Sequence, residues 1–138
     1  MRRLMLVALV SLACAGPKGQ VIYEVADGDV LTAGLSRDLA HWYAVVKTAD
    51  GKIVVVTDGN PGKTYDGISE PVFSPDSKHL ACRVKTGLRI NERWAASLDG
   101  KVGPWYDAAW GPCFTPDGKV GYIGRKGKKL YLVAESVS

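Results

Sequence analysis

Apolar residues in this chain occur in short runs instead of long segments with helical periodicity. The runs are rich in β-branched and aromatic residues and are bounded by Gly, Pro, Asp and Lys, which favours strands over helices. Ile53–Val56 is apolar without alternation, so we expect this strand to be covered on both faces. Further runs lie at 79–84, 93–98, 120–124 and 129–134. The pattern predicts an all-β protein.

One polar motif between these runs occurs twice. "FSPDSK" at 73–78 and "FTPDGK" at 114–119 are 41 residues apart. Pro fits the second position of a type I turn, and Gly118 occupies the last position, where this turn favours Gly. The motif therefore predicts a tight turn between two strands. We assign this structural role to Phe73, Ser74, Pro75, Asp76, Phe114, Thr115, Pro116, Asp117 and Gly118.

A second landmark repeats with the same spacing. Asp58–Gly59 recurs as Asp99–Gly100, and Tyr65–Asp66 recurs as Tyr106–Asp107. Four short strands in a repeat of about 40 to 45 residues are typical of a β-propeller blade. We expect an all-β, β-propeller-like array of about three four-stranded antiparallel blades, partial or open. The expected organisation is N-terminal strands over 16–33 and repeats over 34–138, divided at about 34–70, 71–110 and 111–138.

The segments "PVFSPDSKHLACRVKTG" (71–87) and "PCFTPDGKVGYIGRKGKK" (112–129) resemble the WD40-like (PD40) repeats of the TolB-type β-propellers of bacteria. The resemblance covers roughly residues 34–138. The first unit reads "LSRDLAHWYA" and lacks the Pro, and the last unit has no final "DG…YD" segment. The resemblance implies an exported, non-catalytic module that binds a protein or an envelope component.

Three units are fewer than the four to eight blades of closed propellers. An open array leaves an uncovered face at each end, and stacked repeats gain stability from such interfaces. In the last strand, Leu130 and Leu132 alternate with Tyr131 and Val133, so one of the two pairs must face outward. We expect the protein either to self-associate or to pair its first strands, Val21–Val25, with the last unit.

Residues 1–15 have the layout of a secretory signal, with Arg2 and Arg3, an apolar stretch over Leu4–Ala13, and small residues. Two processing routes fit: cleavage after Ala15, or lipidation of Cys14 with attachment to a membrane. Either route predicts a periplasmic or cell-envelope protein. Without residues 1–15 the net charge falls from +4 to +2, which does not indicate nucleic-acid binding.

Motifs for chemistry are not found in the sequence. Cys82 and Cys113 either form a disulfide or stay buried thiols. His41 and His79 follow the turn motif and have no metal-ligand spacing. The aspartates of the repeated motifs are interpreted as turn-forming side chains. We therefore expect no catalytic residue, no metal and no cofactor.

Large aromatic residues give the strongest sign of a binding surface. Trp105 and Trp110 replace Thr64 and Ser69 of the preceding unit, so the repeat itself does not require them. Exposed Trp is a frequent binding anchor, and blade packing is the alternative role. Two functions remain open: an exported protein-binding or envelope scaffold, or an accessory or degenerate remnant of a propeller-bearing enzyme such as a peptidase.

Overall fold

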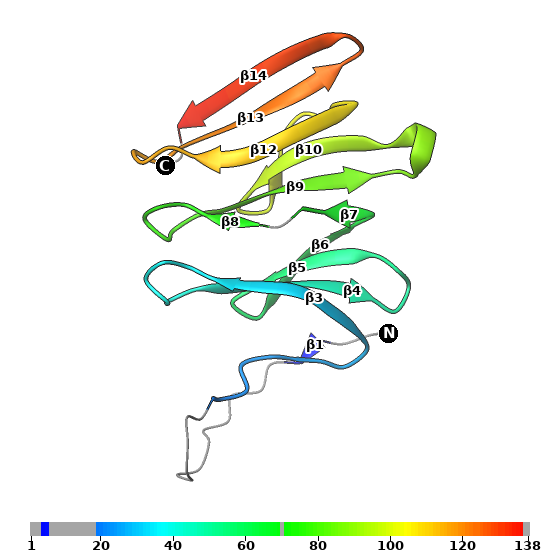
Figure 1. Ribbon diagram of the computed structural model, residues 1–138. Coiled ribbons are helices and arrows are strands. Elements are labelled where there is room, and N and C mark those ends of the chain that lie inside the picture. Colours follow the sequence, from blue (N-terminus) through cyan, green and yellow to red (C-terminus); the bar gives the residue numbers. More distant parts are fainter. Residues whose placement is uncertain (1–3, 6–18, 70, 137–138) are drawn as a thin grey trace.

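The computed structural model describes residues 4–5, 19–69 and 71–136. This part of the chain is all-β apart from one short 3-10 turn, η1 (Arg89–Asn91). Three antiparallel sheets lie one above another, and we call them blades 1, 2 and 3 in chain order (Figure 1). The expected all-β, propeller-like array is confirmed.

Blade 1 has four strands in chain order. Its first strand begins upstream of residue 34, where the sequence repeat was placed, because Gly28 already pairs with Thr48. The second and third strands are buried on both faces, as the uninterrupted apolar run at Ile53–Val56 indicated. The strands are β3 (Gly28–Leu35), β4 (Trp42–Thr48), β5 (Ile53–Thr57) and β6 (Asn60–Tyr65).

Blade 2 has a divided first strand, since two short strands pair with the same neighbour, β9. Its remaining strands follow in chain order, and Tyr106 extends the edge through a bridge to Trp94. The strands are β7 (Gly67–Ile68), β8 (Val72–Phe73), β9 (Leu80–Thr86), β10 (Arg93–Leu98) and β11 (Lys101–Val102).

Blade 3 has three strands among the described residues, where the repeat predicted four. The strands are β12 (Ala108–Phe114), β13 (Lys119–Lys126) and β14 (Lys129–Ser136). The basic run at 125–129 forms the β13–β14 hairpin. Blade 3 lies at the end of the stack, and none of the described sheets lies against one of its two faces (Figure 1).

The N-terminal strands cover blade 1. β2 (Glu24–Val25) pairs with β1 (Leu4–Met5), while Tyr23 and Val25 pack on the cluster of Ala44, Val46, Val54 and Val56. The expected pairing of Val21–Val25 with the last unit is therefore wrong. The reason is proximity: β3 directly follows β2, so the segment folds back on the nearest open sheet face. Apart from Leu4–Met5, the expected signal segment lies outside the described residues.

Apolar clusters fill the space between blades. Tyr43, Val45 and Ile53 of blade 1 pack against Ile68, Phe73 and Leu80 of blade 2. Cys82, Val84 and Ala95 of blade 2 pack against Val55 and Tyr65 of blade 1 and against Trp105. Each sheet thus buries its side chains largely against its neighbours, as expected for stacked repeats.

Candidate binding surfaces and blade junctions

The repeated turn motif folds into a similar hydrogen-bonded loop in each unit, which closes over five residues in the first two units and over four in the third. In blade 2, Ser74 Oγ donates to Asp76 Oδ1 (2.5 Å) and accepts from the His79 amide (3.0 Å). Asp76 Oδ1 also accepts from the Lys78 amide (3.0 Å), and these bonds lower the pKa of its carboxyl group, the Ser74 bond most. Corresponding bonds join Ser36 with Asp38, and Thr115 with Asp117. The loop is structural, and its aspartates satisfy neighbouring amides and hydroxyls.

Two His–Asp pairs connect the turn loops to the following hairpins. His41 Nδ1 lies 2.8 Å from Asp58 Oδ2, and His79 Nδ1 lies 2.6 Å from Asp99 Oδ2. The other oxygen of each carboxylate accepts a backbone amide, from Trp42 for Asp58 and from Leu80 for Asp99. Because each aspartate binds both the histidine ring and a backbone amide at the start of the second strand, each pair holds the turn loop against the hairpin that carries the aspartate.

Blades 1 and 2 are joined by an ion pair that the sequence reading did not predict. Lys52, just before β5, places its Nζ 2.6 Å from Asp66 Oδ1, just before β7. Asp66 Oδ2 accepts the Gly87 amide of its own blade at 2.7 Å. The bond from Lys52 is the main cause that lowers the pKa of Asp66, followed by the amide of Gly87. One carboxylate therefore links two blades.

The junction between blades 2 and 3 repeats this arrangement. Arg93, at the start of β10, donates from NH1 to Asp107 Oδ1 (3.0 Å), and Asp107 Oδ2 accepts the Gly127 amide (2.8 Å). That amide, with help from the charge of Arg93, lowers the pKa of Asp107. Lys52 and Arg93 are 41 residues apart, as are Asp66 and Asp107. The spacing of the two cations was the signal that could have revealed the junction.

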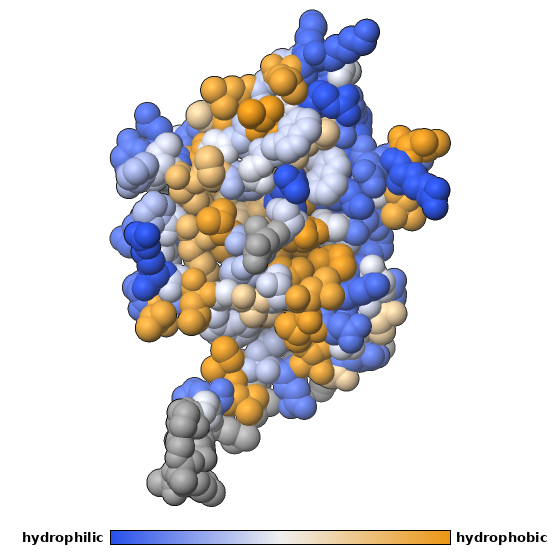
Figure 2. All heavy atoms as spheres, in the orientation of Figure 1, coloured by the Kyte–Doolittle hydropathy of each residue, from blue (hydrophilic) through white to orange (hydrophobic). Residues whose placement is uncertain are grey.

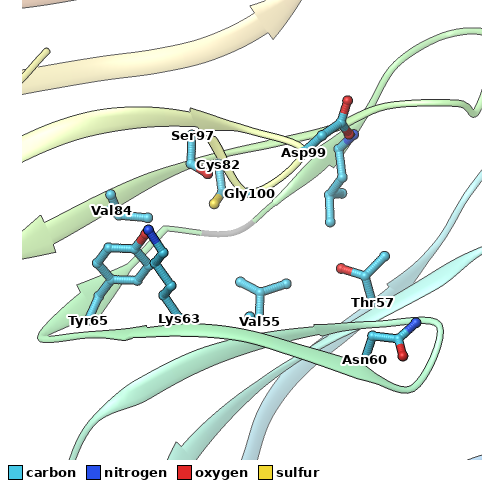
Figure 3. Close-up of a pocket in the computed structure, with 12 residues that line it drawn as sticks. Val55, Thr57, Asn60, Lys63, Tyr65, Cys82, Val84, Ser97, Asp99 and Gly100 are labelled. Carbon is cyan, nitrogen blue, oxygen red and sulfur yellow. The ribbon is translucent and has the colours of Figure 1, made fainter. Parts of the chain in front are cut away.

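A cavity of about 310 Å³ lies between blades 1 and 2 (Figure 3). Val55, Lys63 and Tyr65 of blade 1 and Cys82 of blade 2 point into it, while Asn60 and Asp99 lie at its rim. Burial raises the pKa of the Cys82 thiol to about 11, so the sulfur is protonated at neutral pH and is a poor nucleophile. The cavity can accept an apolar group.

Cys82 and Cys113 are both free, and they differ in exposure: Cys82 is buried and Cys113 is exposed. Of the two alternatives left by the sequence, a disulfide is not formed, and the expectation of a buried thiol is confirmed for Cys82 but wrong for Cys113. Within the described ranges no group of three or more His, Cys, Asp or Glu side chains is placed to hold a metal ion. The same residues include no helix that is long and apolar enough to cross a membrane.

The uncovered side of blade 3, which we call the outer face, carries an apolar row across all three strands. The strand register aligns Trp110 with Ile123, and Ile123 with Leu132. Their exposed fractions are 49%, 39% and 80%. Figure 2 shows hydrophobic residues gathered along β14, next to the hydrophilic β13–β14 hairpin. Large apolar side chains that share one exposed face commonly mark an interaction site.

Two further rows border the apolar row. Ala108, Arg125 and Leu130 align on one side of it, and Cys113, Gly121 and Ala134 on the other. Alternation along β13 and β14, and for Cys113 its pairing with Gly121 beyond the bulge of β12, place these residues on the same face as Trp110. Cys113 also lines a pocket with Phe73 of blade 2. The opposite face of blade 3 carries Tyr122 and Tyr131, whose rings lie 6.1 Å from the ring of Tyr106. The structure thereby selects Leu130 and Leu132 as the outward pair.

Trp105 and Trp110, paired as candidates in the sequence, lie in different environments. Trp105 is half-buried and packs against the Cys82–Val84–Ala95 cluster. Trp110 is exposed on the outer face of blade 3. Its neighbours in that row, Ile123 and Leu132, were not identified as site residues, because cross-strand neighbours follow from register and a β-bulge interrupts β12 between Trp110 and Cys113.

Comparison with known proteins does not assign the chain to a family. No protein-family model matches it, and no curated protein or solved structure matches it either. The candidate surfaces are therefore interpreted from their own geometry.

Proposed function

We propose that this chain is a non-catalytic, propeller-type module that binds a partner protein, and that the outer face of blade 3 receives a β-sheet of that partner. The exposed row of Trp110, Ile123 and Leu132 carries the proposal. The resemblance of the turn motifs to TolB-type repeats supports the same class of function.

The interior of the stack supports this role for the outer face. Register equates Ile123 with Val45 and Leu132 with Val55, since both pairs occupy the same positions in the second and third strands of their blades. Val45 is 3% exposed because Ile68, Phe73 and Leu80 of the next blade cover that side of blade 1. A sheet in the same position on blade 3 would remove Ile123 and Leu132 from water, at about 25 cal/mol per Å² of apolar area.

A second copy of this chain fits the outer face poorly. The opposite end of the stack is covered by Tyr23 and Val25, so it does not present an open sheet face for head-to-tail stacking. The charged residues at outward positions of β12–β14 are Lys119 and Arg125, both basic. Two such faces brought together would oppose like charges, which costs free energy. A different, more acidic protein is the better occupant.

The non-catalytic part of the proposal rests on how the candidate polar side chains are used. Asp76 and Asp117 bind their own turn loops, and Asp99 clamps a hairpin. Asp66 and Asp107 join blades. These bonds account for the repeated aspartates without a reaction.

We also propose that the protein is exported to the periplasm or cell envelope, either soluble or attached through a lipidated Cys14. The Arg2–Arg3 pair followed by apolar and then small residues supports export. The intact mass of the protein from the cell-envelope fraction tests this: loss of about the first 15 residues is expected, and full-length protein in the cytoplasm would contradict it.

Site-specific photocrosslinking in the native cells tests the binding function. A photoreactive residue at Leu132 should give an adduct with another polypeptide, and Trp110→Ala should weaken that adduct because it removes an anchor of the same row. The matched control is Ile90, which is 95% exposed on η1 and lies outside the outer face. If the adducts are homodimers, the occupant of the outer face is a second copy of this chain, and the proposal of a different protein is wrong. No adduct at Leu132, or equal adducts at both positions, would reject the proposed function.

A further inference from the structure

The two blade junctions belong to a series whose third cation has no carboxylate partner among the described residues. Lys52 and Arg93 occupy equivalent places in the strand register, because the next residue lies opposite a matching position of the second strand: Ile53 opposite Lys47, and Trp94 opposite Lys85. In blade 3 the corresponding pair is Leu130 with Arg125, and the residue before Leu130 is Lys129. The position of the junction cation is thus basic in all three blades.

The first two cations of the series bind an aspartate of the following blade. Lys52 binds Asp66, and Arg93 binds Asp107. Each aspartate directly precedes the first strand of its own blade, and its second oxygen accepts the amide of a glycine in the loop after the second strand. In both blades, therefore, a hydrogen bond within the blade holds the carboxylate in place, independently of the cation of the preceding blade.

Lys129 is exposed, and no carboxylate of the described residues pairs with it. It stands at the hairpin end of β14, next to Leu130, as Lys52 stands next to Ile53 at the start of β5, and Leu130 is 67% exposed. Hence both components of a blade junction are present at this end of the stack: an apolar sheet face and an unpaired cation at the junction position.

We propose that the partner docked on the outer face is a propeller-type blade that presents an aspartate immediately before its first strand, and that this aspartate pairs with Lys129. The inference rests on the proposed function, and it specifies the partner by the chemistry of the two junctions within the chain. The geometry also orients the partner, since its aspartate must lie at the β13–β14 hairpin end of blade 3.

An extended chain provides a defined probe for this geometry. In this variant a second copy of residues 99–138 is joined directly after Ala134. Ala134 is the position of blade 3 that corresponds to Leu98 of blade 2, since Ala134 pairs with Gly121 as Leu98 pairs with Ala81. The copy therefore continues from blade 3 as residues 99–138 continue from blade 2. The added unit brings a copy of Asp107 followed by a copy of blade 3. Cys14→Ser, and Cys113→Ser in the copy only, leave the original Cys113 as the reporter on the outer face.

Two measurements separate docking from ion pairing. Labelling of the original Cys113 by a thiol reagent reports whether the outer face is covered. Urea unfolding reports the contribution of the original Lys129: Lys129→Gln should raise the unfolding equilibrium constant about two- to fivefold in the extended chain, the range for an exposed ion pair. It should have no such effect in the parent chain. Lys128→Gln, on the same hairpin, is the matched control and should not show the difference.

The outcomes are distinguishable. Protection of Cys113, together with a Lys129 effect that disappears when the copied Asp107 is changed to Asn, supports the inference. Protection of Cys113 with equal Lys129→Gln effects in both chains would overturn the aspartate–Lys129 pairing and leave the proposed docking intact. Unprotected Cys113 would overturn both.

Discussion

Blade 1 and blade 3 present the same kind of face to the same side of the stack, but only one of these faces is covered. On blade 1, Val45 is buried beneath blade 2, whereas its counterpart on blade 3, Ile123, is 39% exposed. At the next position, Ile53 is 9% exposed and Leu130 is 67% exposed. The difference shows that a blade makes its own apolar face, while the burial of that face is contributed by the neighbouring blade.

The two faces also differ in their junction ions. Lys52 of blade 1 meets Asp66 at 2.6 Å, and Lys129 of blade 3 has no carboxylate partner among the described residues. The outer face of blade 3 therefore resembles an internal junction from which one side is missing. This comparison can be broken or sharpened by substitutions at equivalent positions.

The largest effect is expected for apolar truncation at the covered face. Ile53→Ala should lower the free energy of unfolding by about 2–5 kcal/mol, because it leaves a cavity between blades 1 and 2. Leu130→Ala, at the equivalent uncovered position, should change it by no more than about 0.5 kcal/mol. Urea denaturation of the two variants measures the difference, and equal losses would show that the outer face is already buried in the isolated protein.

A smaller effect is expected from two glycines of one strand. A Cβ at Gly124 would lie 2.5 Å from Cδ1 of Tyr106, on the face toward blade 2. Gly124→Ala should therefore displace that ring and lower the free energy of unfolding by about 1–3 kcal/mol. On the outer face, a Cβ at Gly121 would lie 3.3 Å from the Val133 carbonyl oxygen.

Gly121→Ala serves as the control for Gly124→Ala and should change the free energy of unfolding by no more than about 0.5 kcal/mol. Thermal or urea unfolding of both variants tests the assignment of the two faces of β13. The assignment would be contradicted if Gly121→Ala were the more destabilising change.

The junction ion pair should contribute the smallest effect, and it should depend on pH. The pKa of Asp66 is lowered from 3.8 in the folded protein, so its contribution is complete above the unfolded value and is lost as the pH falls through the folded value. Asp66→Asn should make the decline of stability below about pH 4 shallower. Lys52→Gln should act in the same direction, and the double variant should add little. If the free energy of unfolding of Asp66→Asn falls with decreasing pH as steeply as that of the unchanged protein, the ion pair between Lys52 and Asp66 does not contribute to stability.

The sequence predicted the parts of the fold that depend on local chemistry. The turn motifs around Asp76 and Asp117 specify tight loops through their own side chains, and their period gave the blade repeat. Contacts between units were less accessible. Lys52 and Asp66 are 14 residues apart, and their pairing requires two sheets to be stacked at a particular height. Only the equal spacing of Lys52 and Arg93 indicated that such a pairing could exist.

The candidate site was predicted in part for a related reason. Trp110 was selected because it departs from the repeat, and the structure places it on the exposed face. Ile123 and Leu132 belong to ordinary apolar strands. The alternation of side chains assigns each residue to one of two faces of the sheet, but it does not show which face is covered by another blade. The N-terminal strands illustrate the same limit: Tyr23 was free to cover either end of the stack, and its position on blade 1 follows from tertiary proximity.

Reactivity of Cys113 in intact cells, compared with the purified protein, tests the central claim most directly. In a Cys14→Ser background, a permeant maleimide should modify Cys113 quickly in the purified protein, while buried Cys82 reacts slowly and serves as the internal control. In cells the account predicts that Cys113 becomes protected, because a partner sheet covers the outer face of blade 3. Equal labelling of Cys113 in cells and in the purified protein would contradict the claim that this face is a binding surface.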